Sequence, residues 1–190
     1  IFGGQPFDQS PVRYMKPFRT ELPPIDFPFS ITYHHRLLSL GSCFAGHIGR
    51  RLERNKFQSL LNPFGILYNP ISLADALERL LADRPFEAAD LFEHQGLWHS
   101  FAHHGAFSGP DRTATLQRIN EHLRRGRSFL QKADFLILTL GSAHIFTDRE
   151  SGRVVANCHK LPGQRFERRR LEVREIVERL GPALETIGDR

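Results

Sequence analysis

A serine at position 42 lies where an apolar run ends and a helix-like pattern begins. Residues 37–40 (LLSL) form an apolar run typical of a short buried strand, and Gly41 allows the sharp turn that follows. Apolar residues then recur every four positions from residue 44 to residue 52, which predicts an amphipathic helix. Ser42 is therefore expected at a helix N-terminus, where backbone N–H groups stabilise negative charge. Nucleophilic serines are built at such positions, although a serine there more often only caps the helix.

Several sequence blocks resemble those of the GSCFA family and occur in that family's order. The block at residues 41–45 reads GSCFA, and the blocks together span about residues 18–170. The other blocks are FRTE at 18–21, NPFGILYNP at 62–70, TLGSA at 139–143 and NCHK at 157–160. Because several ordered motifs are more specific than any one of them, the chain is identified as a member of that family. The family is similar to SGNH/GDSL-type esterases.

The resemblance to SGNH hydrolases implies roles for three positions. Ser42 corresponds to the nucleophile, the N–H of Gly65 to a donor for the oxyanion, and Gly141 to the start of the third-block loop. The N–H of Ser42 would be a second oxyanion donor. These enzymes usually carry an asparagine two residues after the third-block glycine, where this chain has Ala143. A side-chain donor would then come from elsewhere, and the candidates are Asn62, Asn69 and Asn157.

A serine nucleophile also needs a base, and the base needs an orienting partner. In the family this pair looks to be an Asp-x-x-His near the carboxyl terminus, and no such motif occurs after residue 160. The sequence is therefore interpreted as a fragment that lacks the pair and would be inactive alone. His104 or His159 is the alternative base.

Further residues are candidates for contacts with the substrate or with the reacting groups. His104 and Ser108 are singled out because HGAFS at 104–108 resembles a family block. The complete set of such candidates is Asn62, Asn69, His104, Ser108, Ser142, Asn157 and His159. Cys43 is an alternative nucleophile, since thiols are the better nucleophiles at neutral pH, but its neighbour Ser42 is favoured by its place in the turn.

Strands and helices alternate along the chain, which predicts an α/β fold with a mostly parallel sheet. The resemblance implies the three-layer α/β/α form of that fold (flavodoxin-like, SGNH-hydrolase-like), incomplete at its C-terminus. Residues 135–140 are apolar on both faces and are expected inside the sheet. Ligands bind beyond the carboxyl ends of parallel strands. Ser42 and Gly141 follow strand ends and Gly65 follows a possible strand at 56–61, so three segments should meet at one crevice.

The remaining elements complete a single domain over residues 36–190, the N-terminal part of the GSCFA/SGNH-like domain. Residues 1–35, rich in proline and phenylalanine, are expected to form an extended arm packed on that body. Histidine-rich residues 86–112 are interpreted as a loop that folds over a pocket, because no pair of histidines has the spacing of a metal motif. Helices are expected over 72–84, 111–130 and 171–187, the last interrupted or kinked near Gly181-Pro182, and a hairpin over 145–156.

Composition limits the classes of function. The 190 residues, 40% of them hydrophobic, can bury one sizeable core. A net charge of +5 invites a nucleic-acid interpretation, but the basic residues alternate with acidic ones in the helical stretches, as on a solvated helix face. No apolar run reaches the length of a membrane span, and no signal segment opens the chain, so cytoplasmic placement is the default.

The sequence therefore predicts a serine esterase or acyltransferase that acts on a small-molecule or saccharide acyl ester without a metal or other cofactor. The alternative is a non-catalytic ligand- or carbohydrate-binding module on the same fold. Nucleic-acid binding is the third and weakest interpretation. The acyl group, the acceptor and the oligomeric state do not follow from the sequence.

Overall fold

The computed structural model describes residues 20, 22–23, 25–82 and 84–189. The chain divides into two units, residues 1–30 and 31–190. In the first unit the described residues include the rings of Phe27 and Phe29, whose centroids lie 5.9 Å apart. Most of the predicted arm and of the FRTE block lies outside the described residues, so the packing of that arm on the body stays a prediction.

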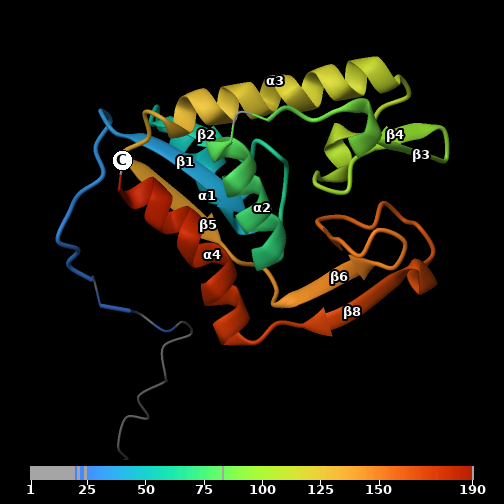
Figure 1. The fold of residues 1–190 in the computed structure, drawn as a ribbon. Helices are drawn as coiled ribbons and strands as arrows, with labels where there is room; N and C mark the ends of the chain where they lie inside the picture. The colour runs from blue at the N-terminus through green and yellow to red at the C-terminus, as the bar shows by residue number, and fades with distance from the viewer. Residues whose placement is uncertain (1–19, 21, 24, 83, 190) are drawn as a thin grey trace, which may run out of the picture. The chain divides into compact units, whose positions relative to one another are not determined.

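Three parallel strands form a sheet (Figure 1). This sheet carries the turn at Gly41-Ser42, which we call the serine turn. Their order is β2 (Gln58–Leu61), β1 (Arg36–Gly41) and β5 (Phe135–Thr139). Leu38 of β1 pairs in register with Leu60 on one side and Leu136 on the other. The predicted parallel α/β architecture is thereby confirmed. The sequence expected residues 135–140 inside the sheet, but β5 lies at one edge of the sheet that the described residues form.

Four α-helices accompany this sheet, namely α1 (Cys43–Arg54), α2 (Pro70–Leu81), α3 (Arg112–Leu130) and α4 (Val173–Gly188). Leu38 and Leu40 alternate out of β1 into a core that also contains apolar residues of α2, α3 and α4. On α1, Gly49 approaches the side chain of Leu61 so closely that an added Cβ would meet it at 1.9 Å. Burial of these leucines by the helices is the main apolar driving force that holds the sheet in place.

Helix boundaries follow local chemistry that the sequence indicated only in part. Asp111 caps α3 as expected, with its carboxylate 2.6 Å from the N–H of Ala114. The helix predicted over 72–84, with Ser72 expected as its cap, begins earlier and ends at Leu81: the Asn69 side chain accepts the N–H of Ser72 at 2.8 Å and Pro70 begins the helix. The structure shows no break in α4 at Pro182, which lies inside the helix.

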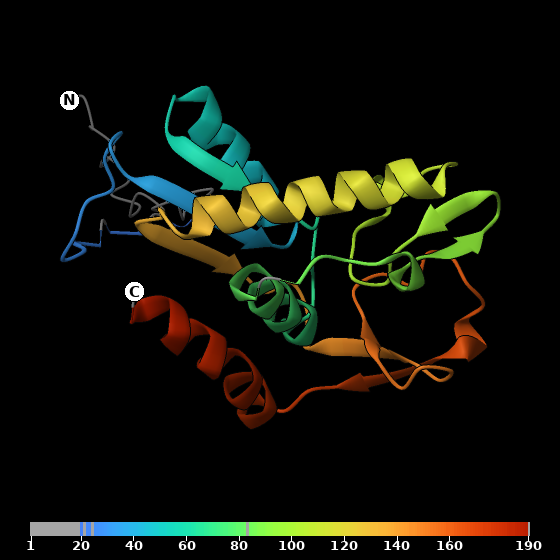
Figure 2. The ribbon, with the colours of Figure 1, turned by 45° about the horizontal axis from the view of Figure 1, so that its top comes forward.

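The second group of strands is antiparallel. The hairpin of β3 (Phe92–His94) and β4 (Leu97–His99) lies within the histidine-rich segment, which the sequence treated as irregular. A second sheet has the order β7 (Val154–Val155), β6 (His144–Asp148) and β8 (Phe166–Arg170), so the predicted hairpin is confirmed. Figure 2 shows α3 extending from the parallel sheet to the β3–β4 hairpin, and it contacts both. Short 3₁₀ helices occur at η1 (Ala88–Asp90), η2 (Gly105–Phe107) and η3 (Gly163–Arg165).

None of the helices over the described ranges is both long and apolar enough to pass through a bilayer.

Candidate functional site

Ser42 lies between the end of β1 and the start of α1, where it is the N-cap of the helix. Its N–H donates to the backbone oxygen of Thr139 at 3.1 Å and lies 3.0 Å from that residue's Oγ1. Its own Oγ lies 3.0 Å from Thr139 Oγ1 and accepts the N–H of Phe44 at 3.3 Å. Ser42 is only 6% exposed. In this conformation the hydroxyl therefore caps the helix and is held against the end of β5.

The loop after β2 is hydrogen-bonded to the serine turn. The N–H of Gly41 donates to the side-chain oxygen of Asn62 at 2.9 Å, and the N–H of Leu67 donates to the carbonyl of Gly41 at 2.9 Å. Asn62 adopts a positive φ of 40°, which turns the chain at the end of β2. These bonds fix the NPFG segment beside Ser42, as the parallel order of the strands requires.

The loop after β5 completes the junction. The N–H groups of Gly141 and Ser142 both donate to the carbonyl of Tyr68, at 2.9 and 3.0 Å. A Cβ on Gly141 would lie 2.7 Å from the Tyr68 ring and 3.1 Å from the Cβ of Ser42, so only glycine allows this approach. The hydroxyl of Ser142 accepts the N–H of His144 at 2.9 Å, where β6 begins. The three loops that follow β1, β2 and β5 thus meet at one end of the sheet.

Gly65 lies in this junction, but its N–H has an acceptor. It donates to the carbonyl of Asn62 at 2.7 Å and closes a tight turn. Gly65 has a φ of +78°, and an added Cβ would lie 2.4 Å from the Cβ of His104. An oxyanion could use this N–H only after the turn releases it.

Replacing Gly65 by alanine should therefore destabilise the fold more than replacing Gly96, which has nearly the same φ of +74° and open space around it. The backbone strain of alanine in this region costs about 1–2 kcal/mol at either position. At Gly65 the collision with His104 should add about 1–3 kcal/mol. Urea unfolding of the two variants measures the difference, and equal losses would show that the contact between Gly65 and His104 is not as tight as described.

Two of the three asparagines considered as side-chain donors are used or lie elsewhere. Asn69 is buried, and besides capping α2 its Nδ2 donates to the carbonyl of Val155 at 3.3 Å. The Oδ1 of Asn157 accepts the N–H of His159 at 2.8 Å, and its Nδ2 lies 3.8 Å from the position of a Cβ on Gly105. Asn157 therefore borders the histidine-rich segment, and over the described ranges no hydrogen bond joins it to Gly41 or Ser42.

Asn62 differs from both. Its Oδ1 is fixed by the N–H of Gly41, and its Nδ2 makes no hydrogen bond within the part of the chain that the structure describes. That amide group points along α1, 3.8 Å from the position of a Cβ on Gly46. Asn62 is therefore the candidate with a free donor beside the serine turn.

The histidines do not supply a base in this conformation. His104 is next to Gly65, and its backbone N–H donates to the carbonyl of Phe64 at 3.0 Å. His159 is buried and donates from Nε2 to the carbonyl of Ser100 at 2.8 Å, and burial lowers its pKa to about 4. Among the described residues, the polar contacts of the Ser42 hydroxyl are Thr139 and the N–H of Phe44.

Ser108 has a partner that the sequence did not indicate. Its hydroxyl lies 2.7 Å from Nδ1 of His99, whose Nε2 donates to the carbonyl of His94 at 3.1 Å. Because Nε2 carries the proton, Nδ1 accepts from the hydroxyl. The pair connects the end of β4 to the segment that follows η2, and within the described part of the chain no hydrogen bond joins it to Ser42.

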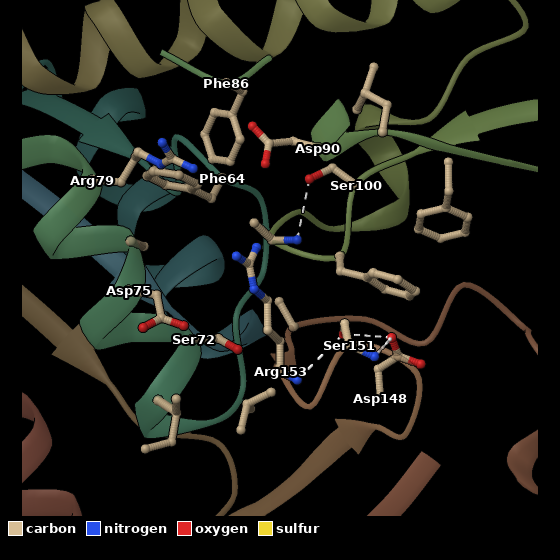
Figure 3. Close-up of a pocket in the computed structure, with 18 of the residues that line it drawn as sticks. Phe64, Ser72, Asp75, Arg79, Phe86, Asp90, Ser100, Asp148, Ser151 and Arg153 are labelled. Carbon is tan, nitrogen blue, oxygen red and sulfur yellow. Dashed lines mark hydrogen bonds between the residues drawn. The ribbon is translucent and has the colours of Figure 1, made fainter. Parts of the chain in front are cut away.

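An open cleft of about 900 Å³ lies apart from the serine turn (Figure 3). It is lined by α2, by residues 84–92 and 100–102, and by the loop between β6 and β7. The histidine-rich segment does border a pocket, as expected, but Ser42, Gly65 and Gly141 do not line it. Phe64 lines the cleft, and the adjacent Gly65 contacts His104. The loop junction and the cleft are therefore neighbouring but distinct candidate sites.

Among the residues that the structure describes, no three His, Cys, Asp or Glu side chains are grouped so that they could hold a metal ion. Both cysteines are free thiols; Cys43 is exposed, and burial raises the pKa of Cys158.

The parallel sheet with its three joined loops defines an α/β protein whose candidate site lies beyond the carboxyl ends of the strands. A family model for GSCFA proteins matches residues 36–189, and the chain therefore belongs to the GSCFA family. Comparisons with curated proteins and with solved structures gave no match.

Proposed function

We propose that this protein is a serine esterase or acyltransferase with Ser42 as its nucleophile. The observation that carries the proposal is the meeting of the three loops at Ser42. A serine at a helix N-terminus lies there between an asparagine-bearing turn and a glycine-bearing turn, and hydrogen bonds join the loops. Such a junction positions a nucleophile beside donors for an oxyanion.

In the proposed reaction the Ser42 Oγ attacks the carbonyl carbon of an acyl ester while a base takes the hydroxyl proton. The tetrahedral intermediate collapses with loss of the alcohol, which receives that proton, and leaves an acyl group on Ser42. Water or an acceptor alcohol then attacks the acyl-enzyme and restores the hydroxyl. A small-molecule or saccharide acyl ester fits this chemistry.

The oxyanion is assigned to Asn62 Nδ2, together with the N–H groups of Ser42 and Gly65. The first is free, whereas the other two donate to Thr139 and to the carbonyl of Asn62 in this conformation. Substrate binding would therefore have to exchange these two internal bonds for bonds to the oxyanion. It would also have to draw the Ser42 hydroxyl away from Thr139.

The base is assigned to a group outside the described residues, because none of these presents a histidine or carboxylate to the Ser42 hydroxyl. His104, which contacts Gly65, is the alternative within the chain. His104→Gln separates the two assignments, because esterase activity should fall only if His104 is the base.

We also propose that the sheet belongs to a flavodoxin-like three-layer domain in which a further strand lies beside β5. The apolar character of residues 136–138 on both faces supports this arrangement. Ser39 and Leu61 pair in register and so share a face, which Gly49 of α1 approaches. Leu38 and Leu40 face the other way, into the core with α2, α3 and α4.

The test is covalent labelling of the full-length protein by a fluorophosphonate, which reacts with activated serines. We expect labelling that Ser42→Ala abolishes and Cys43→Ser leaves intact. Asn62→Asp keeps the oxygen that accepts from Gly41 but removes the Nδ2 donor, and it should slow labelling about a hundredfold. Asn157→Asp is the matched control and should have little effect. Labelling that survives Ser42→Ala would overturn the proposal.

The second candidate function is a non-catalytic ligand- or carbohydrate-binding module. It is favoured by one observation, namely that the Ser42 hydroxyl is 3.0 Å from Thr139 Oγ1 and has no base among the described residues. Absence of labelling in the correctly folded full-length protein would support this second function instead of the first.

A further inference from the structure

The open cleft has a charged lining that the serine chemistry does not use. Five carboxylates and several arginines lie on its walls, over floor residues such as Phe64 and Ala102. Figure 3 shows Arg153 reaching from the β6–β7 loop toward α2, and Arg79 reaching from α2 toward Phe86. Whether this lining attracts cations or anions depends on which charges are already paired within the fold.

Every carboxylate of the cleft already has a hydrogen-bond donor. Arg179 of α4 binds two of them on α2, Arg165 binds one at the end of β6 and one on the β6–β7 loop, and the fifth accepts a backbone N–H. The pairs are Asp75 and Glu78 with Arg179, Asp148 and Glu150 with Arg165, and Asp90 with the N–H of Glu87. Two arginines and one backbone N–H thus serve as the hydrogen-bond donors of these five carboxylates.

Three guanidinium groups of the same cleft, those of Arg79, Arg84 and Arg153, have no carboxylate hydrogen-bonded to them among the described residues. Arg153 makes no side-chain hydrogen bond or ion pair with any residue that the structure describes, and it is exposed. Arg79 lies 4.0 Å from the centroid of the Phe86 ring and donates only to backbone carbonyls, those of Arg84 and Pro85 at 3.3 and 3.4 Å. Burial, more than the neighbouring charges of Arg84 and Arg153, lowers the pKa of Arg79, while Asp90 and Asp75 act in the opposite direction.

We propose that this cleft binds a small organic anion, with Arg153 and Arg79 holding a phosphate or carboxylate group of the ligand. A guanidinium offers two parallel N–H donors that match both of these groups. The volume of about 900 Å³ is within the range of small-molecule sites. Phe101, Val154 and Ala156 provide apolar wall for the remainder of the ligand. This inference goes beyond the proposed function and does not depend on Ser42.

Asp75 sets the balance of charge at this site. It lies close enough to Arg153 for the arginine's charge to lower its pKa, although burial has the larger effect and raises that pKa overall. Asp75 therefore competes with an anionic ligand for Arg153, while its own ion pair is with Arg179. Removing this carboxylate should strengthen anion binding, whereas a purely structural role of Arg153 gives no reason for such an effect.

The test is calorimetric titration with two probes, inorganic pyrophosphate and malonate, at low ionic strength. We expect saturable binding of at least one probe; pyrophosphate alone would indicate a phosphate ligand, and malonate alone a carboxylate ligand. Arg153→Gln should weaken binding about ten- to a hundredfold, and Asp75→Asn should strengthen it. Because Arg153 makes no side-chain hydrogen bond or ion pair with the residues that the structure describes, its substitution should leave the melting temperature nearly unchanged.

Arg149→Gln is the matched control. Arg149 lies in the same β6–β7 loop and is exposed, but it faces Glu167 at 3.9 Å and does not line the cleft. This variant should bind both probes like the unmodified protein. Failure of both probes to saturate, or an equal loss in Arg149→Gln and Arg153→Gln, would overturn the proposal. If Arg153→Gln proves unstable, Asp75→Asn decides, and unchanged or weaker binding in that variant counts against the site.

Discussion

Replacing Asp148 by asparagine should lower the free energy of unfolding by about 1.5–3 kcal/mol, because Arg165 loses its buried charged acceptor and keeps only the exposed Glu150. Asp148 at the end of β6 has no exposed surface. It accepts from Nε of Arg165 at 2.6 Å and from the hydroxyl of Ser151 at 2.6 Å. These donors lower the pKa of Asp148 to about 2, so the carboxylate is charged throughout the useful pH range.

Glu167→Gln is the control, since Glu167 on β8 pairs with Arg149 at 3.9 Å and both side chains are exposed. Its loss should cost less than about 1 kcal/mol. Urea unfolding at neutral pH compares the two variants. A loss for Asp148→Asn as small as that for Glu167→Gln would mean that the Asp148–Arg165 pair does not stabilise the β6–β8 sheet.

Lowering the pH from about 6.5 to about 4 should strongly lower the free energy of unfolding, because two buried histidines are neutral in the folded protein and take up protons when it unfolds. Burial, together with the charge of Arg79, lowers the pKa of His103 to about 3, and burial lowers that of His159 to about 4. Both are neutral in the folded state, and each gains a proton in the unfolded chain below pH 6.5. Each should therefore remove about 1.4 kcal/mol per pH unit until the pH reaches its folded pKa.

The pH profile of unfolding free energy tests this sign and this window. His103→Gln should be less stable at neutral pH, since the ring packs between Phe64 and Phe86. The free energy of unfolding of this variant should fall less steeply with decreasing pH, because one fewer proton is taken up on unfolding. A profile that is flat between pH 6.5 and 4 would contradict the burial of these histidines. Loss of the Asp148 contribution belongs to a lower window, from about 3.8 to about 2.

Local patterns explain why the parallel sheet could be predicted. Each pattern reflects the burial of one strand or one helix and can be recognised without knowing the rest of the fold. The patterns are the apolar runs at 37–40 and 135–139 and the four-residue spacing after Ser42. The relative order of these elements then places the three loops at one end of the sheet. The GSCFA resemblance, which the family match confirms, was likewise carried by short contiguous blocks.

The parts that sequence did not predict depend on partners far away in the chain. Residues 166–170 (FERRR) have no strand-like alternation, yet they form β8 because they pair with β6, on the side opposite β7. The amide of Asn69 caps α2 locally through Ser72, but its second bond, to the carbonyl of Val155, joins residues 86 positions apart and cannot be predicted from neighbouring residues. The cleft could not be predicted from the sequence for the same reason, since its walls come from segments about 80 residues apart.

Within the candidate site, sequence predicted the positions better than the states of the groups. Ser42, Gly65 and Gly141 occupy the expected loops, but the N–H of Gly65 is committed to Asn62 and the Ser42 hydroxyl to Thr139. Hydrogen bonds of this kind are decided by the geometry of the turn, which motif spacing does not specify. Asn62 could be distinguished from Asn69 and Asn157 only because the structure shows which side-chain amide group makes no hydrogen bond to a described residue.

Mass spectrometry of the labelled protein tests the assignment of Ser42 as the nucleophile, because it identifies the residue that reacts. Trypsin releases residues 37–50, a peptide that contains both Ser42 and Cys43, and fragmentation of that peptide distinguishes the two. The account predicts a single fluorophosphonate adduct on Ser42. An adduct on Cys43, or on Ser108 beside His99, with Ser42 unmodified, would contradict it.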